Sequence, residues 1–310
     1  MSAISPNSQT YIGRFAPSPT GPLHFGSLVS ALASYLDAHH NNGKWLVRIE
    51  DLDPPREQAG AADAILHCLE NYGLEWDDSV LYQSQRWNIY EAYLEQLRQQ
   101  NLIYACDCTR QDLQGMGGIY TGRCRNRSVD PNKPHALRLK LHDLPSRFPN
   151  QEELRFTDLI QGEQIQKLRG QAGDQILKRK DGLYAYQLAV VVDDIEQNIT
   201  HIIRGSDLLE VTARQIFLFQ LLNAPVPAFG HVTLASQPNG QKLSKQNLAP
   251  ALELKDAEKN LWHALAFLNQ NAPKELCGST SELLGWAKVH WQRSKVRGLS
   301  AIYSPHGSSI

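Results

Sequence analysis

The sequence has no long apolar run and no sign of an export signal. Its first ten residues, MSAISPNSQT, are polar, and no later run is long enough to span a bilayer. We therefore expect a cytoplasmic protein with no membrane partner. The chain also has neither an internal repeat nor a low-complexity segment. With 310 residues, 42% of them hydrophobic, it is expected to fold as one large globular domain with insertions or as two domains.

Cysteine and net charge are both low. Five cysteines, an odd number, argue against a disulfide framework and leave metal binding or buried thiols open. The formal net charge of -1 gives no overall attraction to nucleic acid, so an RNA partner would need a local basic patch. Residues 167–182 and 286–298 are candidates for such a patch, although charge runs of this kind are more often solvated faces.

The stretch RFAPSPTGPLHFGS, residues 14–27, joins an expected strand at 11–15 to an expected helix. After Gly26, leucines recur at helical spacing, and Gly43 offers a stop. Glycines in the turn let a ligand approach the backbone, and the N–H groups at a helix N-terminus face outward. The pattern favours a phosphate or adenine site, while an ordinary strand-to-helix connection would look the same locally.

The rest of the chain alternates strands and helices around an irregular middle. We expect a buried strand at 44–50, helices at 61–73, 86–100 and 207–222, a short strand at 136–141, and further alternation through 184–195 and 199–205. Two βα halves around an insertion predict an α/β fold with a Rossmann-type doubly wound parallel sheet. The expected parts are the first half of this α/β domain at 1–105, an inserted subdomain at 106–177, the second half at 178–246 and a helical tail at 247–310.

Five stretches occur in the order and spacing seen in glutamyl-tRNA synthetases, class I enzymes with a Rossmann-type catalytic domain. They are RFAPSPTGPLHFGS, RIEDLDPPR, YQLAVVVDD, HIIRGSD and KLSK. The chain resembles that family from about Tyr11 to Gln246. LHFGS resembles the first ATP signature of the class, with Ser27 where histidine or glycine often stands. KLSKQ resembles the second signature, with Leu243 and Gln246 departing from its commonest letters.

The resemblance implies that the chain activates glutamate with ATP. The α-carboxylate of glutamate attacks the α-phosphorus and expels pyrophosphate, so negative charge must be stabilised as it shifts. By resemblance, the catalytic residues are His24, Gly26, Lys242 and Lys245, and His24, Gly26 and Lys245 hold ATP. A metal ion on the phosphates, expected to be Mg²⁺, would add to this stabilisation.

Specificity for glutamate is expected to rest on guanidinium groups. A γ-carboxylate is flat and charged, and arginine presents a rigid fork of donors that matches it. The resemblance implies that Arg14 and Arg204 bind the amino acid and that Glu50 receives its α-ammonium group. The remaining residues of this expected set are Phe15, Ala16, Pro17, Ser18 and Tyr186. The acidic residues left open as structural or polar-network groups are Asp53, Asp193 and Asp194.

A cysteine cluster in the middle of the chain is a second signal. Residues 105–127 contain Cys106, Cys108, Tyr120 and Cys124. Three thiolates with one further donor satisfy tetrahedral Zn²⁺, whereas Cys68 lies in an apolar helix and Cys277 stands alone. Some glutamyl-tRNA synthetases and their short relatives carry zinc here through three cysteines and a tyrosine. The resemblance therefore implies one structural zinc in the insert, with Asp107 or His135 as alternatives to Tyr120.

The far end of the chain departs from the family. After Gln246 only some 60 residues remain, too few for the large anticodon-binding domain of ordinary members, and 260–270 and 283–292 read as amphipathic helices. A glutamate-activating core with a zinc insert and no such domain resembles the short relatives of the family. Those relatives attach glutamate to the queuosine base in the anticodon loop of tRNA(Asp).

The partners implied are ATP, L-glutamate and tRNA(Asp) carrying queuosine, bound by a chain expected to act as a monomer. Single-stranded loops suit such recognition because their bases can be splayed out and stacked. Basic residues that could hold the RNA backbone are Lys167, Arg169, Lys178, Arg179, Arg293, Lys295 and Arg297. Two other hypotheses stay open. One is a general synthetase core that charges a tRNA 3′ end with a separate anticodon-binding subunit, and the other is a non-catalytic binding module.

Overall fold

The structure is a computed structural model, and it describes residues 10–141, 144, 152–168, 173–236, 250–296, 298 and 300–302. Six residues singled out by the sequence lie outside the described residues: Arg169, Lys242, Leu243, Lys245, Gln246 and Arg297. No helix in the described ranges combines the length and apolar content that a membrane crossing requires.

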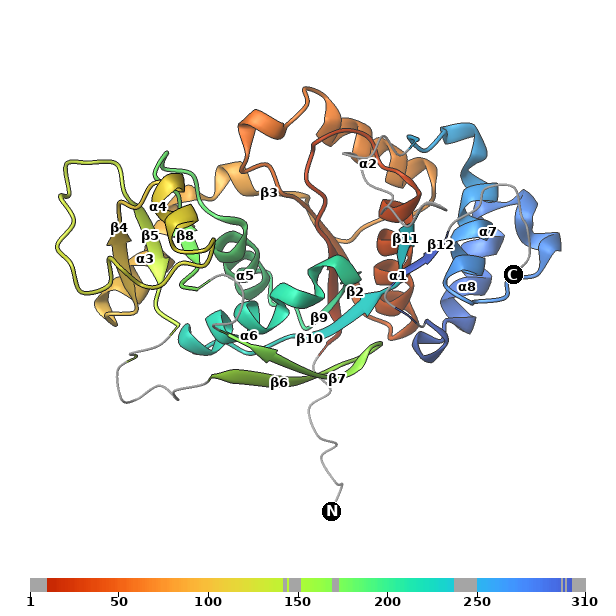
Figure 1. Cartoon of the computed structure of the whole chain (residues 1–310). Coiled ribbons are helices and arrows are strands. Elements are labelled where there is room, and N and C mark those ends of the chain that lie inside the picture. The colour runs from red at the N-terminus through yellow and green to blue at the C-terminus, as the bar shows by residue number, and fades with distance from the viewer. Residues whose placement is uncertain are drawn as a thin grey trace, which may run out of the picture.

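A parallel sheet forms the centre of the molecule (Figure 1). Its strands are β1 (Ile12–Phe15), β2 (Lys44–Ile49), β3 (Leu81–Tyr82), β9 (His201–Gly205) and β10 (Ala228–Val232). β1 pairs with β2, β2 with β3 and β9 with β10, all in parallel. β1 also lies beside β9, because the Thr200 backbone N–H donates to the Ile12 carbonyl at 2.9 Å. The spatial order β3, β2, β1, β9, β10 agrees with the doubly wound sheet expected from the sequence.

Helices cover both faces of this sheet. They are α1 (Phe25–His40), α2 (Ala61–Asn71), α3 (Trp87–Gln99), α5 (Tyr186–Glu196) and α6 (Thr212–Leu221), the last preceded by a 3₁₀ turn, η3 (Ser206–Val211). Side chains alternate along β2, so Trp45 and Val47 join the core that contains α1, while Leu46 joins the core that contains α5 and α6. A near-continuous apolar strand is expected where a parallel sheet is buried on both sides.

The turn after β1 brings the backbone close to the end of β2. The Glu50 N–H donates to the Pro17 carbonyl at 3.0 Å. Gly21 has a φ of 134°, a conformation that residues with a side chain rarely adopt, so the turn requires glycine there. Proline and glycine therefore shape a rigid connection from the sheet into α1.

Two separate parts occupy the middle of the chain. One is an antiparallel sheet of β4 (Ile103–Cys106), β5 (Ala136–Leu139) and β8 (Ile176–Lys178) with the short helix α4 (Arg110–Gly115), which lies at one end of the molecule (Figure 1). The other is a hairpin of β6 (Glu153–Asp158) and β7 (Gly162–Lys167). The hairpin lies against the central sheet, where the Leu159 N–H donates to the Phe229 carbonyl of β10 at 2.8 Å.

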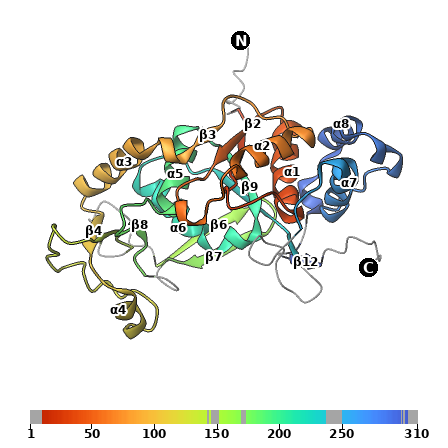
Figure 2. The ribbon, with the colours of Figure 1, turned by 90° about the horizontal axis from the view of Figure 1, so that it is seen from above.

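The tail packs on the opposite end of the molecule from α4 (Figure 2). Its elements are α7 (Ala257–Phe267), α8 (Thr280–His290) and the short strand β12 (Ser300–Ile302), which pairs in parallel with β11 (Leu234–Ser236) of the preceding part. Helices α7 and α8 contact α1, and their buried leucines belong to the same core as α1. The two helices predicted for the tail are therefore confirmed.

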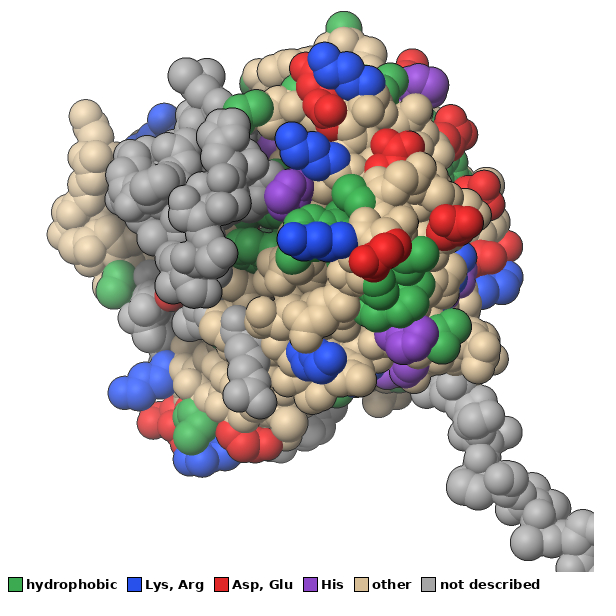
Figure 3. All heavy atoms as spheres, turned by 90° about the vertical axis from the view of Figure 1, so that its right-hand side faces the viewer, with side chains coloured by type: hydrophobic (Ala, Val, Ile, Leu, Met, Phe, Trp, Pro, Cys, Tyr) green, Lys and Arg blue, Asp and Glu red, His purple; other side chains and the backbone are tan. Residues whose placement is uncertain are grey.

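Asp37 of α1 holds the end of the tail through buried polar contacts. Arg293 donates to it from Nε at 2.9 Å and from Nη2 at 2.8 Å, and the Trp291 indole donates at 2.8 Å. Tyr11 also donates to this carboxylate. The Arg293 guanidinium is thus engaged in the fold, so the suggestion that it holds an RNA backbone is not supported. Among the described residues of this face, Figure 3 shows Lys and Arg side chains alongside Asp and Glu.

Candidate active site

A cavity of about 380 Å³ lies at the carboxyl ends of β1 and β9. Nine residues expected from the sequence line it: Arg14, Phe15, Ala16, Ser18, His24, Gly26, Glu50, Tyr186 and Arg204. Pro17 is not among the lining residues and acts through its carbonyl, which holds the Glu50 backbone. Lining residues that the sequence reasoning missed include Ser27, Ser30, Asp207 and Leu208. The fold therefore brings together side chains that are far apart in the sequence, such as Arg14 and Arg204, which are 190 residues apart. They meet at the edge of the sheet where doubly wound folds bind their ligands.

His24 caps the N-terminus of α1 at the wall of the cavity. Its Nδ1 accepts a hydrogen bond from the Ser27 backbone N–H at 3.2 Å. A neutral imidazole that accepts at Nδ1 carries its proton on Nε2 and so offers a donor there. The outward N–H groups and positive dipole end of a helix favour an anion, so this side of the cavity suits a phosphate.

Arg14 is held in place by a buried ionic network. Its Nε and Nη2 donate to the two oxygens of Asp194 at 3.0 and 3.2 Å, which leaves Nη1 as the remaining nitrogen. Arg48 donates from Nη2 to the same carboxylate at 2.7 Å, and it also lies 4.0 Å from Asp193. The two guanidinium groups hold the pKa of Asp194 below its usual range, against the opposing effect of burial. Asp193 and Asp194 therefore have a structural role in the site, which is one of the possibilities that the sequence left open for them.

Arg204 is a buried cation without a carboxylate partner among the described residues. Its Nε donates to His231 Nε2 at 3.0 Å and its Nη2 to the Thr212 hydroxyl at 2.8 Å, while the buried Nη1 has no hydrogen-bond partner in the described part of the chain. Burial lowers the pKa of this guanidinium, and Arg14 lowers it further. An anion in the cavity would relieve both effects.

Glu50 supplies the opposite charge. Burial raises the pKa of its carboxyl to about 7, although Arg48 and Arg14 oppose the rise. Its buried Oε1 lies 3.9 Å from Arg48 Nε, and neither atom has a hydrogen-bond partner in the described ranges. Two residues that line the cavity thus carry an unsatisfied polar atom within the described ranges, a donor on Arg204 and an acceptor on Glu50.

A second cavity of about 370 Å³ lies beside the first and shares Ser18, Glu50 and Tyr186 with it. Its other walls are formed by Thr20, Leu52, Asp53, Arg56, Glu57, Gln83, Arg179, Tyr184 and Ala185. Arg179 lies 3.5 Å from Asp53 across this space. The two cavities are therefore neighbours that share one wall.

The expected second ATP signature lies in a segment whose described flanks meet the first cavity. Leu234 and Ala235, just before residues 237–249, line the cavity. Just after them, Ala251 forms a bridge with His24, and the Leu252 N–H donates to the Leu23 carbonyl at 2.9 Å. Lys242 and Lys245 themselves lie outside the described residues, and their roles stay predictions.

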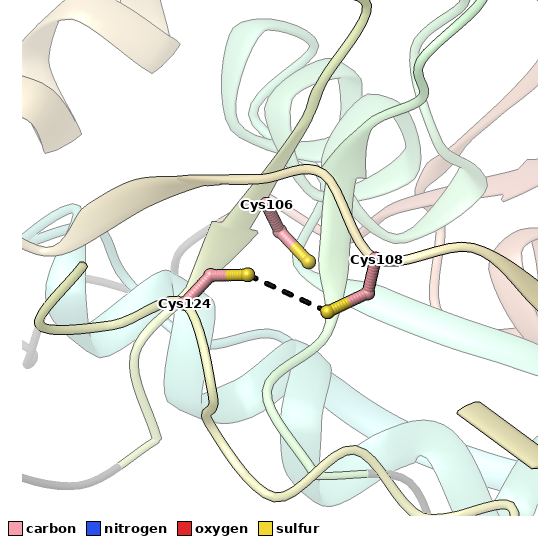
Figure 4. A group of neighbouring side chains, drawn as sticks. All are labelled: Cys106, Cys108 and Cys124. Atoms are coloured by element: carbon pink, nitrogen blue, oxygen red, sulfur yellow. Dashed lines mark hydrogen bonds between the residues drawn. The ribbon is translucent and has the colours of Figure 1, made fainter. Parts of the chain in front are cut away.

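The cysteine cluster forms beside the sheet of β4, β5 and β8, with Cys106 at the end of β4 and Cys108 and Cys124 in loops (Figure 4). The sulfur atoms of Cys106, Cys108 and Cys124 lie within 4.8 Å of one another and are buried, and the Cys108 and Cys124 sulfurs are 3.4 Å apart. Tetrahedral zinc with bonds of about 2.3 Å places its sulfur ligands roughly 3.8 Å apart, so the cluster fits such an ion. All three are free thiols, so the cluster is not a disulfide.

Among the candidates for a fourth ligand, Tyr120 lies within the cluster. It is 3% exposed, packs with the three cysteines, and its hydroxyl accepts from the Cys124 N–H at 2.9 Å. Asp107 approaches Cys124 at 3.4 Å but also pairs with Arg127. His135 is outside the cluster, because its Nδ1 bonds the Lys133 carbonyl and its side chain is not buried. The geometry favours Tyr120.

Comparison with known proteins agrees with this architecture. The family described as tRNA synthetases class I (E and Q), catalytic domain, matches residues 12–270. A protein of Pseudomonas aeruginosa PAO1 named glutamyl-Q tRNA(Asp) synthetase is 49% identical over 290 residues, which cover 93% of this chain and 96% of that protein. Its counterpart of the same name in Serratia proteamaculans is 50% identical over 293 residues, 94% of each chain.

Solved structures are similar as well. The glutamate-tRNA synthetase of Elizabethkingia anophelis superposes with a TM-score of 0.80 at 25% identity, covering 96% of this chain and 68% of that one. The same values hold for a glutamate tRNA ligase of Elizabethkingia meningosepticum solved in complex with its amino acid. Because the family matches most of the chain and the named relatives are about half identical over nearly their whole length, this chain belongs to the class I tRNA synthetases of the E and Q group.

Proposed function

We propose that the protein activates glutamate with ATP and transfers it to the queuosine base of tRNA(Asp). The observation that carries the first half is the pair of unsatisfied groups in the cavity, Arg204 Nη1 and Glu50 Oε1. A cation and an anion at separate positions match an amino acid that has a side-chain carboxylate and an α-ammonium group. Glutamate fits this charge pattern, and glutamine does not, because its amide cannot compensate a buried guanidinium.

Within this proposal each expected residue has a defined task. Arg204, with Arg14 beside it, binds the γ-carboxylate, and Glu50 receives the α-ammonium group. His24 Nε2 and the N-terminus of α1 near Gly26 bind the phosphates of ATP. Mg²⁺ would supply charge stabilisation on those phosphates when bound with ATP. The donors are already fixed in the fold, so little reorganisation is needed as charge develops.

Binding of glutamate should depend on pH through Glu50. The pKa of this carboxyl is raised to about 7, so it is mostly protonated at pH 6 and cannot pair with an ammonium group there. Because no group of free glutamate titrates between pH 6 and 8, the dissociation constant should rise about tenfold from pH 7.5 to 6. Calorimetry without ATP would measure this and should detect proton release at pH 6. A constant affinity, or the same pH profile in Glu50→Gln, would contradict the assignment.

The second half of the proposal is supported by the second cavity and by the relatives. An acceptor hydroxyl must reach the activated carboxyl group, and the second cavity borders the first at Ser18, Glu50 and Tyr186. Asp53, Glu57 and Arg179 in the walls of the second cavity offer hydrogen bonds to a base. The name of the relatives that match along nearly their whole length points to tRNA(Asp) as the acceptor.

The decisive experiment is transfer of radiolabelled glutamate to tRNA(Asp) with and without queuosine. Of the two tRNAs, we expect only the one that contains queuosine to accept glutamate. An isolated anticodon stem-loop that carries queuosine should accept glutamate as well, although it has no 3′ CCA end. Periodate treatment of the stem-loop, which cleaves the vicinal diol of queuosine, should abolish transfer. Equal transfer to queuosine-free tRNA, or efficient charging of the 3′ end of tRNA(Glu), would instead support a general synthetase core.

We further propose that the insert carries one structural zinc, held by Cys106, Cys108, Cys124 and Tyr120. Four protein ligands would leave no open position, so the ion would stabilise the insert and take no part in catalysis. The insert would then correspond to residues 106–177, as the sequence suggested, although its sheet extends to Ile103 on one side and Lys178 on the other.

Replacing Cys106 by serine should lower zinc affinity more than about 100-fold and destabilise the insert locally, since metal binding and folding are coupled. Elemental analysis of protein purified without chelator should find one zinc per wild-type chain and less in the variant. Cys277→Ser, a free cysteine outside the cluster, is the matched control and should retain the zinc. Wild-type protein without zinc would contradict the proposal.

A further inference from the structure

An aspartate, a histidine and an arginine form a buried chain of hydrogen bonds behind the first cavity. Asp158, the last residue of β6, lies 2.5 Å from His231 Nδ1 through its Oδ2. His231 of β10 lies 3.0 Å from Arg204 of β9 through its Nε2. The side chains of Asp158 and His231 are fully buried, and Arg204 is 5% exposed. The three residues come from three different strands, β6, β10 and β9.

The donors and acceptors in this chain have one consistent arrangement. Arginine Nε always carries a hydrogen, so His231 Nε2 must accept and the imidazole proton must be on Nδ1, directed at Asp158. Asp158 is fixed in turn, because its Oδ1 accepts from the backbone N–H groups of Ile160 at 3.0 Å, Gln161 at 2.8 Å and His231 at 3.1 Å. Asp158 therefore selects the tautomer of His231, and that tautomer gives Arg204 an acceptor.

This arrangement determines which nitrogen of Arg204 meets the cavity. Nε is bound by His231, and Nη2 is bound by Thr212 at 2.8 Å and the Leu208 carbonyl at 3.3 Å. Nη1 alone has no partner in the described part of the chain. We propose that Asp158 and His231 are positioning residues that hold Arg204 in the orientation that reads a carboxylate. The inference rests on the proposed binding of glutamate by Arg204.

Asp158 belongs to the hairpin of β6 and β7, so the hairpin contributes to recognition of the amino acid. β6 and β7 dock on the edge strand β10, with the Leu159 N–H bonded to the Phe229 carbonyl at 2.8 Å. Asp158 reaches His231 only from this docked position. The hairpin thereby sets the hydrogen bonding of Arg204 through His231, although no described residue of the hairpin hydrogen-bonds Arg204 directly.

Asp158→Asn is the sharpest test. Its amide oxygen can keep the three backbone bonds of Oδ1, while its NH₂ group then faces Nδ1 and drives the imidazole proton to Nε2, against the N–H of Arg204. In ATP–pyrophosphate exchange, the KM for glutamate should rise at least about tenfold, the loss of one hydrogen bond to a charged group, with little change in kcat or in the KM for ATP. Thr157→Ala, an exposed neighbour on the same strand, is the matched control and should behave as wild type.

Two substitutions of His231 separate positioning from simple packing. In His231→Gln the amide oxygen occupies the place of Nε2 and can still accept from Arg204, so the KM for glutamate should stay near the wild-type value. In His231→Asn the amide matches Nδ1 and leaves Arg204 Nε without its acceptor, so the KM should rise as in Asp158→Asn. Thermal unfolding of each variant checks that the fold is retained.

The outcomes separate this inference from the function on which it rests. If the wild-type enzyme is active, two outcomes would overturn the positioning role alone. One is an equal KM for glutamate in His231→Gln and His231→Asn, and the other is an unchanged KM for glutamate in Asp158→Asn. A wild-type enzyme with no glutamate-dependent exchange would overturn both the inference and the proposed function. A raised KM in Asp158→Asn and His231→Asn that His231→Gln restores would support the inference.

Discussion

Replacement of Arg204 by leucine should nearly abolish activation of glutamate. The substrate carboxylate would then enter a buried site without the cation that compensates its charge, and an uncompensated buried charge costs about 3–5 kcal/mol. That corresponds to a loss of kcat/KM for glutamate of roughly 10³-fold in pyrophosphate exchange, with the affinity for ATP almost unchanged. Arg204→Lys should recover only part of the activity, because an ammonium group cannot bind His231, Thr212 and a substrate carboxylate in one plane.

The specificity of the same variant provides its own control. Without the guanidinium, the site no longer requires a negatively charged substrate side chain. The ratio of kcat/KM for glutamate to kcat/KM for glutamine should therefore fall in Arg204→Leu. If the variant keeps the wild-type rate with glutamate, Arg204 does not bind the substrate and the amino-acid site has to be placed elsewhere in the cavity.

Loss of the Asp194 carboxylate should cause the largest change in stability of any single substitution considered for this chain. Asp194 accepts from Arg14 and Arg48 and is 2% exposed, so Asp194→Ala leaves two buried guanidinium groups short of a partner. Breaking a buried ion pair from one side typically costs about 3–5 kcal/mol. Urea unfolding, followed by a spectroscopic probe of the central domain, would measure the change in the free energy of unfolding.

An exposed pair offers the contrasting measurement. Lys44 and Asp78 lie 3.0 Å apart, but their side chains are 50% and 58% exposed. Asp78→Ala should therefore change the free energy of unfolding by less than about 1 kcal/mol. Similar values for Asp78→Ala and Asp194→Ala would mean that water or a rearrangement of the arginines compensates the buried site.

The wild-type pair also has a defined pH dependence. The pKa of Asp194 is lowered in the folded state, so its stabilising contribution is present above the unfolded-state pKa and is lost as the pH falls through the folded-state value. Acid unfolding of Asp194→Ala should accordingly be less steep than that of the wild type.

Local patterns in the sequence predicted much of the central fold. The helices at 61–73 and 86–100 and the strand at 44–50 differ from α2, α3 and β2 by one to two residues at most of their ends, because apolar spacing is strong in these segments. The hairpin of β6 and β7 was not predicted. Its second strand, GEQIQK, is polar and half exposed, and such an edge carries little apolar signal.

The candidate site was predictable to a different extent. Arg14, Glu50 and Arg204 were expected from resemblance to a family, and they lie together in the first cavity. His231 and Asp158 were not expected, since they are 73 residues apart and neither belongs to a recognisable motif. Hydrogen-bond partners of this kind depend on how a hairpin docks on a distant strand, which no spacing rule describes.

The contacts of Asp37 bear on the order in which the chain acquires its structure during synthesis. Asp37 is in the first helix, whereas Arg293, which compensates its buried charge, follows 256 residues later. At roughly 5–20 residues per second, a ribosome would need about 13–50 s to make that intervening length. During this interval α1 can pack on the sheet only with an uncompensated carboxylate, so the nascent protein should resist proteolysis fully only after Trp291 and Arg293 have emerged.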